Sequence, residues 1–154
     1  MRVQCLDIGN SKAKLGVFED EHLCQIKQFE TNDVISNPSM LASIITDGNS
    51  DLCYCSVVPI AEDAILKHLS GFKEKIHSIS PDFCAGIPIS YDNKKEIGAD
   101  RIANAIAAYH TLPLPAVVID LGTATTFDII SQDGGYEGGV ILPGPQGFLD
   151  FLES

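Results

Sequence analysis

Two short stretches of the sequence each bring together a carboxylate, a glycine and small polar side chains. Residues 7–11 read Asp-Ile-Gly-Asn-Ser, and residues 120–124 read Asp-Leu-Gly-Thr-Ala. The glycine lets backbone N–H groups approach a phosphate closely, and the carboxylate can hold Mg²⁺ or another cation beside it. Hydroxyl and amide groups, and the nearby Lys14, would add donors and one positive charge. Two such tips facing each other would form a phosphate clamp.

A single Asp-x-Gly is also ordinary hairpin chemistry, and one copy alone would favour that interpretation. The second copy of the motif favours a functional interpretation instead. Asp120 follows Asp7 by 113 residues, which matches the size of one domain. We therefore predict a duplicated β-β-β-α-β-α unit whose second copy stops after about three strands. The predicted boundaries are 1–113 for the first lobe and 114–154 for the start of the second.

The elements that must position these tips follow from hydrophobic patterning. Apolar and β-branched runs predict strands at 2–8, 13–20, 22–30, 52–58, 75–80, 116–121, 125–131 and 136–142. Proline near the start and glycine at the end predict helices at 37–48 and 59–72, and alanine content predicts a third at 101–110. The intervening residues 81–100 predict a long loop, a kind of segment that often carries function.

Composition limits the class of protein. The chain has 154 residues, 45% of them hydrophobic, with a formal charge of -11 and five cysteines. The negative charge argues against nucleic acid as a partner, because such affinity depends on clustered Lys and Arg. No apolar stretch approaches the length of a membrane-spanning helix, so no membrane partner is expected. An odd number of cysteines, mostly in apolar runs, suggests reduced thiols and a cytoplasmic location.

Four blocks of sequence together resemble a known family. They are residues 7–14, GADR at 98–101, DLGTATTFD at 120–128 and GGVILPG at 138–144. Their order and spacing resemble those of the bacterial type III pantothenate kinases, members of the actin-like ATPase superfamily. The resemblance implies an α/β ribonuclease H-like (actin-like ATPase) fold, a mixed sheet with helices on both faces. One full lobe would be followed by the first strands of a duplicated second lobe.

The resemblance also implies an activity and a set of site residues. The activity is ATP-dependent phosphorylation of pantothenate to 4'-phosphopantothenate, the first step of coenzyme A biosynthesis. Its cofactors are ATP with Mg²⁺ and a monovalent cation, potassium or ammonium, and its expected assembly is a homodimer. The ATP-binding residues would be Asp7, Ile8, Gly9, Asn10, Ser11, Lys12, Ala13, Lys14 and Thr123. The pantothenate-binding residues would be Tyr91, Gly98, Ala99, Asp100 and Arg101.

The resemblance also implies separate roles for three carboxylates. Asp100 is the proton acceptor, Asp120 falls where the family binds the monovalent cation, and Asp7 lies near Mg²⁺ and the phosphates. Gly138, Gly139 and Gly144 match the family's glycine signature without an assigned step.

The residues around Asp100 allow a functional and a structural interpretation. Asp100 could deprotonate the attacking hydroxyl, and Arg101 could hold a substrate carboxylate through two hydrogen bonds. Alternatively, Asp100 caps the helix at 101–110 and Arg101 pairs with a surface acid. Both interpretations could hold together.

The chain departs from the family in length, because members of the family are considerably longer. We expect it to be part of a longer product or to pair with another copy or fragment, since three strands alone would leave a sheet edge and an apolar face uncovered. The alternatives to an active kinase are a noncatalytic regulatory or binding protein resembling Bvg accessory factor, or an inactive truncated kinase. A further alternative is an actin-like kinase acting on a sugar or acid.

Overall fold

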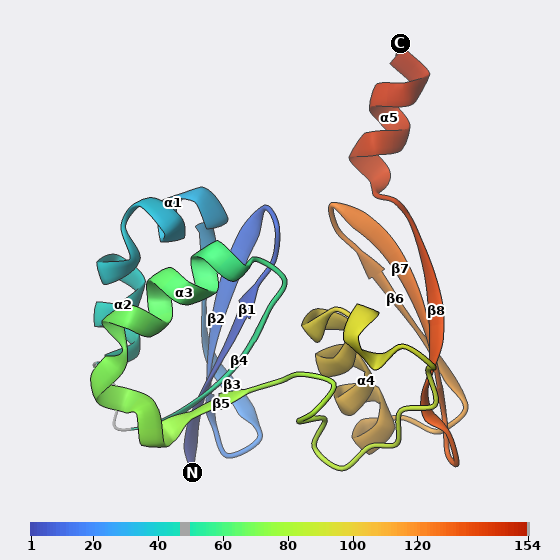
Figure 1. The fold of residues 1–154 in the computed structure, drawn as a ribbon, viewed down its shortest axis with the longest axis horizontal. Coiled ribbons are helices and arrows are strands. Elements are labelled where there is room, and N and C mark those ends of the chain that lie inside the picture. Colours follow the sequence, from blue (N-terminus) through green and yellow to red (C-terminus); the bar gives the residue numbers. More distant parts are fainter. Residues whose placement is uncertain (47–49, 154) are drawn as a thin grey trace. The chain divides into compact units, whose positions relative to one another are not determined.

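The computed structural model describes residues 1–46 and 50–153. The chain divides into two compact units, Met1–Ile79 and Ser80–Ser154, and each has its own β-sheet (Figure 1). Both units combine helices with a β-sheet, which confirms the predicted α/β class.

The first unit is built on a mixed five-stranded sheet of order β3-β2-β1-β4-β5. Strands β1, β2 and β3 form an antiparallel meander, whereas β4 joins β1, and β5 joins β4, in parallel. The strands are β1 (Arg2–Ile8), β2 (Lys12–Glu19), β3 (His22–Glu30), β4 (Asp51–Ser56) and β5 (Ile76–Ser78). All five were predicted from apolar runs, with ends that differ by a few residues.

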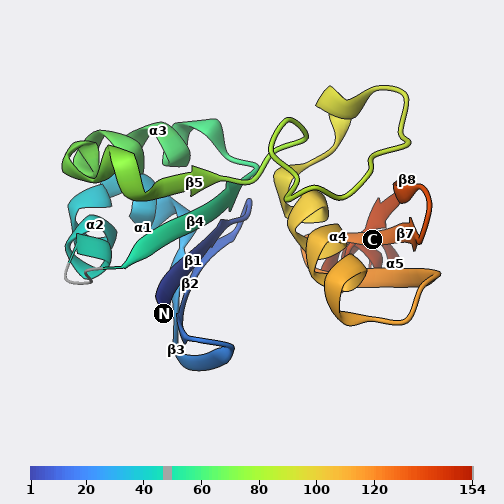
Figure 2. The ribbon, with the colours of Figure 1, turned by 90° about the horizontal axis from the view of Figure 1, so that it is seen from below.

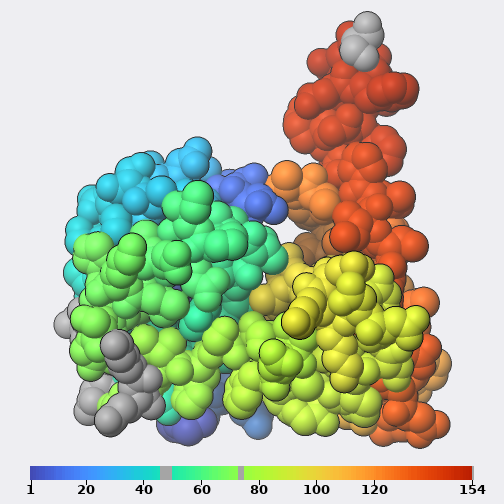
Figure 3. Space-filling view, in the orientation of Figure 1, coloured from blue at the N-terminus to red at the C-terminus, as the bar shows by residue number. Residues whose placement is uncertain are grey.

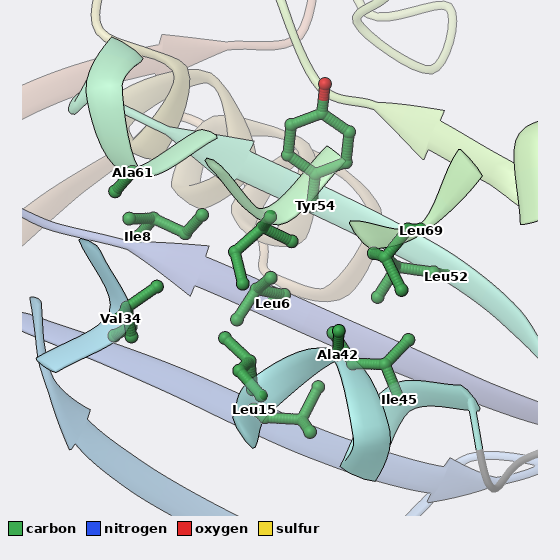
Figure 4. Packing of buried hydrophobic residues seen from close by; sticks show 13 residues of the cluster. Leu6, Ile8, Leu15, Val34, Ala42, Ile45, Leu52, Tyr54, Ala61 and Leu69 are labelled. Carbon is green, nitrogen blue, oxygen red and sulfur yellow. The ribbon is translucent and has the colours of Figure 1, made fainter. Parts of the chain in front are cut away.

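The core of the first unit lies between one face of this sheet and three helices (Figures 2 and 4). Alternate residues of the strands point to this face, and Leu6, Ile8 and Leu15 are each at most 2% exposed. Burial of such a side chain contributes about 1.5–3 kcal/mol. The helices are α1 (Thr31–Ser36), α2 (Pro38–Thr46) and α3 (Pro59–His68), and the 3-10 helix η1 (Ser70–Lys75) follows α3.

The helix predictions were right for α2 and α3, but α1 was not predicted. A six-residue helix is too short to show a helical period, and its N-cap residue, Glu30, makes no capping hydrogen bond with its side chain. The predicted stop of α2 at Gly48 lies outside the described residues. The predicted helix 59–72 divides into α3 and η1 near Leu69.

The second unit consists of a three-stranded antiparallel meander with a helix against it. A loop containing only the 3-10 helix η2 (Lys94–Glu96) leads into α4, in agreement with the long loop predicted at 81–100. Helix α4 packs against the sheet through Ile102, Ala105 and Ala108. The remaining elements are α4 (Ala99–Thr111), β6 (Ala116–Leu121), β7 (Ala124–Ser131), β8 (Gly135–Pro143) and α5 (Pro145–Glu153).

Packing and repeat divide the chain at different places. The repeat predicts a boundary between residues 113 and 114, whereas the compact units meet between residues 79 and 80. The difference arises because α4 packs on the second sheet. The predicted boundary thus follows the sequence repeat, whereas the contacts of α4 place this helix in the second unit.

Candidate active site

The tip between β1 and β2 is a hairpin loop tied down by the start of α1. Gly9 N–H donates to the Lys12 carbonyl oxygen at 3.0 Å, which closes the turn. The buried Thr31 donates its hydroxyl to the Gly9 carbonyl at 2.7 Å and its backbone N–H to the Ser11 carbonyl at 2.9 Å. The two hydrogen bonds from Thr31 therefore hold the loop in place, while Asn10 and Ser11 are exposed to solvent. Thr31 is a supporting residue that the sequence analysis missed.

Asp7 and Lys14 are neighbours on the same face of the first sheet. They lie directly opposite each other in the pairing of β1 with β2. Asp7 is half-buried and accepts a hydrogen bond from the Cys55 thiol at 3.6 Å, whereas Lys14 is exposed. Lys12 lies two residues before Lys14 on β2, opposite Glu30 of β3, with its Nζ 3.9 Å from Glu30 Oε1. The structure thus brings a carboxylate and an ammonium group to the base of the predicted phosphate loop.

The tip between β6 and β7 repeats this design with one residue fewer. Asp7 pairs with a residue seven positions later, but Asp120 pairs with Thr126, six positions later. Gly122 N–H closes this turn on the Ala124 carbonyl at 3.0 Å. Asp120 and Thr123 are both exposed. The second tip is therefore a tighter hairpin that presents its carboxylate and hydroxyl to solvent.

Two neighbours support the second tip. Asn104 of α4 donates from Nδ2 to Asp120 Oδ2 at 3.3 Å. Gly144 N–H donates to the Thr123 carbonyl at 3.1 Å, and a Cβ on Gly144 would come within 2.2 Å of the Gly122 carbonyl oxygen. The last glycine of the signature is thus required by close backbone contact. Asn104 was not predicted, although its position four residues after Asp100 places the two on one side of α4.

Asp100 lies in the first turn of α4 and does not cap it. The N-cap residue is Gly98, which has no side chain to serve as a cap. The half-buried Asp100 accepts a hydrogen bond at Oδ1 from Arg101 N–H at 2.8 Å. A carboxylate in a first turn is stabilised by the partial positive charge of the helix N-terminus. The simple capping interpretation of Asp100 is therefore wrong.

Arg101 forms an ion pair with a buried carboxylate, not with a surface acid. Its Nε donates to Asp128 Oδ1 at 2.8 Å, and Tyr136 Oη donates to the same oxygen at 2.9 Å. The Arg101 Nη2 lies 2.6 Å from that oxygen in the ion pair, without the geometry of a hydrogen bond. Asp128 is 0% exposed and the Arg101 side chain is 11% exposed. The Arg101 guanidinium also lies 5.8 Å from the centre of the Tyr136 ring. The pair is neutral overall and buried beneath α4.

This network shifts two pKa values. Burial alone would lower the pKa of Arg101, but the hydrogen bonds and charge of Asp128 outweigh it and the pKa is raised. Burial, with the hydrogen bond to Asp128 and its charge, raises the pKa of Tyr136 well above its ordinary value. Both groups therefore keep the proton that they donate to Asp128.

Tyr91 approaches this network over the glycines of β8. Its ring packs edge-on against Tyr136 with the ring centres 6.4 Å apart. Gly138 has φ +125°, and a Cβ there would meet the Tyr91 ring at 3.0 Å. A Cβ on Gly139 would come within 2.0 Å of the Phe127 carbonyl oxygen and 2.6 Å of Arg101 Nη2. The first two glycines of the signature thus make room for Tyr91 and Arg101.

The structure therefore brings the predicted residues together in two groups. Residues 7–14 form one group in the first unit, and Tyr91, 98–101, Asp120 and Thr123 belong to the second unit. Asp128 and Tyr136 were missed as site residues, although both fall in or near blocks that carry the family resemblance. Within the described residues no three His, Cys, Asp or Glu side chains form a group that could hold a metal ion. No helix found there is long and apolar enough to span a membrane.

Comparison with known proteins gives consistent matches over nearly the whole chain. The family described as type III pantothenate kinase matches residues 4–154. A type III pantothenate kinase of Methylacidiphilum infernorum is 41% identical over 96% of this chain and 53% of its own length. One of Desulfosudis oleivorans is 39% identical over 90% of this chain and 58% of its own length. The chain spans little more than half the length of these relatives.

Solved structures show the same fold. A Baf family protein of Campylobacter jejuni is 25% identical with a TM-score of 0.58, over 97% of this chain and 59% of that one. The ethanolamine utilization protein EutJ of Carboxydothermus hydrogenoformans has a TM-score of 0.53 at 14% identity, covering 99% of this chain and 56% of its own. At that identity the likeness concerns the fold alone, and it agrees with the predicted actin-like architecture.

Proposed function

Because the chain belongs to the type III pantothenate kinase family, we propose that it supplies the phosphate and pantothenate sites of an ATP-dependent pantothenate kinase. The product would be 4'-phosphopantothenate, in the first step of coenzyme A biosynthesis. One observation carries the proposal beyond the family match. Tyr91 and Arg101, both in the segment that resembles the pantothenate site, pack around Tyr136 in one folded unit.

Asp100 is the proposed proton acceptor. The terminal hydroxyl oxygen of pantothenate attacks the γ-phosphorus of ATP, the bond from that phosphorus to the β-γ bridging oxygen breaks, and ADP leaves. The hydroxyl proton passes to the Asp100 carboxylate. Support comes from the position of Asp100, half-buried at the start of a rigid helix with Oδ1 held by the Arg101 N–H. That bond fixes the carboxylate and leaves Oδ2 as the oxygen to receive the proton.

Pantothenate would lie along Gly98 and Ala99 with Tyr91 beside it. Nε of Arg101 is bonded to Asp128 and the buried Nη2 is ion-paired with it, so the edge of the guanidinium that carries Nη1 would be the part that donates to a substrate carboxylate. Asp128 would hold that edge in one orientation. A preoriented donor loses less conformational entropy when the substrate binds.

The proposed phosphate site combines residues 7–14 with Thr123. Exposed loop residues Asn10 and Ser11 offer hydroxyl, amide and backbone donors, and Lys14 supplies a positive charge beside Asp7. Asp7 would hold Mg²⁺ and Asp120 the monovalent cation, since carboxylate oxygens suit hard cations. Asp120 fits this role because it is exposed and the hydrogen bond that it accepts from the Asn104 amide is long, at 3.3 Å. Bound cations neutralise charge on the phosphoryl group during transfer.

A cytoplasmic homodimer acting on small molecules completes the proposal. The alternative is a noncatalytic regulatory protein, and the similarity to a Baf family protein of known structure is the observation that favours it. Under this alternative, nucleotide or pantothenate would bind without turnover.

A coupled assay of ADP release with pantothenate, with and without potassium, tests the proposal. The assay uses the 154-residue chain and a longer version extended with the remainder of a relative. We expect pantothenate-dependent turnover that Asp100→Asn lowers by at least about a hundredfold. The matched control is Asp133→Asn, an exposed aspartate in the turn before β8, which should keep wild-type turnover.

Three results separate the alternatives. Turnover by the longer version alone would show that the 154-residue chain is not sufficient for the kinase activity of the family. Binding of both ligands by calorimetry without turnover in either version would favour the regulatory alternative. Phosphorylation of a sugar or another acid, again abolished by Asp100→Asn, would identify a different actin-like kinase.

A further inference from the structure

Two cysteines lie side by side on the face of the first sheet that points away from its hydrophobic core. Strand β1 pairs with β4 in parallel, and Cys5 is the direct partner of Cys53 in that register. Their neighbours Leu6 and Leu52 are buried in the core, so strand alternation turns both cysteines to the opposite face. Both are free cysteines, Cys5 exposed and Cys53 half-buried. The pair is therefore a dithiol that small molecules in solution can reach.

The helices of the first unit lie on the other face of this sheet. Helices α1, α2 and α3 pack over the core, and in Figure 3 their cyan and green atoms form most of the visible surface of the unit. On the face of the thiols, Cys5 has Gly16 of β2 on its other side, and Cys53 has His77 of β5. The next pair along the two strands on this face is Asp7 with Cys55. The thiols thus belong to a row of side chains that the three helices leave uncovered.

Strand spacing brings the two cysteines within the range of a disulfide. Adjacent strands lie about 4.7–4.9 Å apart, and the Cα atoms of a disulfide are about 4.4–6.8 Å apart. The pKa of Cys5 supports this proximity. Burial of the thiol raises that pKa, and the neighbouring Cys53 raises it further, because two adjacent thiolates repel each other. Burial also raises the pKa of Cys53, so both groups are mainly thiols at neutral pH.

The residue types in this row also occur in metal sites. Among the residues that the structure describes, however, no three His, Cys, Asp or Glu side chains are grouped closely enough to hold a metal ion. The reaction open to two adjacent thiols without a metal is disulfide formation. In a reducing compartment such a bond is transient and forms when conditions become oxidising.

We propose that Cys5 and Cys53 are a modification site that closes to a reversible disulfide by exchange with a small disulfide of the glutathione class. The exposed Cys5 thiolate attacks one sulfur of glutathione disulfide, forms a mixed disulfide and releases one glutathione thiolate. The Cys53 thiolate then attacks Cys5 Sγ, which forms the Cys5–Cys53 bond and breaks the bond from Cys5 to glutathione. The two released thiolates take up the two protons that the cysteines lose, and two electrons pass from the protein to the glutathione disulfide.

The disulfide would join β1 to β4 next to the predicted phosphate loop. Asp7 is one register pair away on the same face and accepts the hydrogen bond from the Cys55 thiol across the same two strands. The redox state of the pair would therefore act at the base of that loop. This site goes beyond the proposed kinase activity and does not depend on it.

The test treats the 154-residue chain with glutathione disulfide at about pH 8, where thiolate is more abundant, and then alkylates the remaining thiols. Mass spectrometry of tryptic peptides locates the cross-link. Trypsin leaves Cys53 and Cys55 on one peptide, so two variants assign the bond. Cys55→Ser should keep the cross-link to Cys5, and Cys53→Ser should abolish it. Dithiothreitol should open the bond again.

Cys24 is the internal control for reaction at any exposed thiol. It is exposed on β3, and the neighbouring strand β2 contains no cysteine. We therefore expect only a mixed disulfide with glutathione at Cys24. Because the second step at Cys5 is intramolecular, the pair should be half oxidised at a glutathione disulfide concentration at least about tenfold below that which modifies half of Cys24.

Three results would overturn the proposal. One is a cross-link that survives Cys53→Ser and disappears in Cys55→Ser. Another is a pair that carries only mixed disulfides with glutathione, and the third is oxidation of the pair at the same concentration as Cys24. Circular dichroism checks that Cys53→Ser is folded, and Cys5→Ser, at an exposed position, provides the same test if it is not. None of these measurements uses ATP or pantothenate, so this proposal and the proposed function can fail independently.

Discussion

Replacing Asp128 by asparagine tests the buried ion pair directly, because the substitution keeps the shape and removes the charge. In the wild-type protein Asp128 Oδ1 accepts one hydrogen bond from Arg101 Nε and one from Tyr136, Arg101 Nη2 lies 2.6 Å from it, and Asp128 is fully buried. Removing one partner of a buried pair leaves the other charge uncompensated, which costs about 3–5 kcal/mol. The amide would also turn an N–H₂ group towards the position of Oδ2, which has no hydrogen-bond partner in the part of the chain that the structure describes.

The assay is urea unfolding followed by circular dichroism, since the chain contains no tryptophan. A loss of about 3–5 kcal/mol is a large part of the 5–15 kcal/mol typical of a domain, so the midpoint should fall sharply. Asp120→Asn is the matched control, because that aspartate is exposed and accepts a single long bond from Asn104; its change should stay within about 0.5 kcal/mol.

A double variant distinguishes charge from packing. Arg101→Met combined with Asp128→Asn removes both charges, so it should regain about 1–3 kcal/mol over Asp128→Asn alone. Two results would contradict this account of the pair. One is a free energy of unfolding for Asp128→Asn within about 1 kcal/mol of wild type; the other is a loss of stability in the double variant equal to the sum of the losses in the two single variants.

Two further predictions concern the same network. Gly139→Ala should destabilise the protein by at least about 1–3 kcal/mol, since the added Cβ would lie 2.0 Å from the Phe127 carbonyl oxygen. Gly71→Ala is the control and should be nearly neutral, because a Cβ there would have no atom within 4 Å. Equal urea midpoints for the two variants would contradict this prediction. The raised pKa of Tyr136 stabilises the fold below about pH 10, and this contribution falls as pH rises above that value, by up to about 1.4 kcal/mol per pH unit. Tyr136→Phe should therefore flatten the loss of stability between about pH 10 and 12 relative to wild type, and Tyr109→Phe should not; the measurement is urea unfolding across that range.

Much of the fold could be predicted because strand alternation and turn residues are local signals. The run at 2–8 coincides with β1, and the repeat at 120–124 correctly places a second hairpin. Helix α1 was missed because its six residues carry no period, and its fixed position depends on Thr31, whose bonds to the β1–β2 turn are made across the fold. Such contacts are set by tertiary packing and leave no mark in a single sequence.

The candidate site likewise has features that are visible in the sequence and features that depend on tertiary contacts. The glycines of the signature could be located in the sequence, but their purpose could not, since it depends on the approach of Tyr91 and Arg101 to β8. The partner of Arg101 was likewise beyond reach, because Asp128 lies 27 residues away and is indistinguishable by sequence from a surface aspartate. Only the pairing of β7 with its neighbours turns Asp128 towards α4.

The two aspartate tips share a design in which the hydrophobic core orients the carboxylate. Asp7 lies between Leu6 and Ile8, whose side chains enter the core of the first unit, so strand alternation turns Asp7 to the opposite face. Asp120 lies in the same way between Ile119 and Leu121, but those two side chains are exposed in this chain. The carboxylate of Asp7 is therefore oriented by a buried core, whereas the side chains on either side of Asp120 make no such core contact in the described part of the chain.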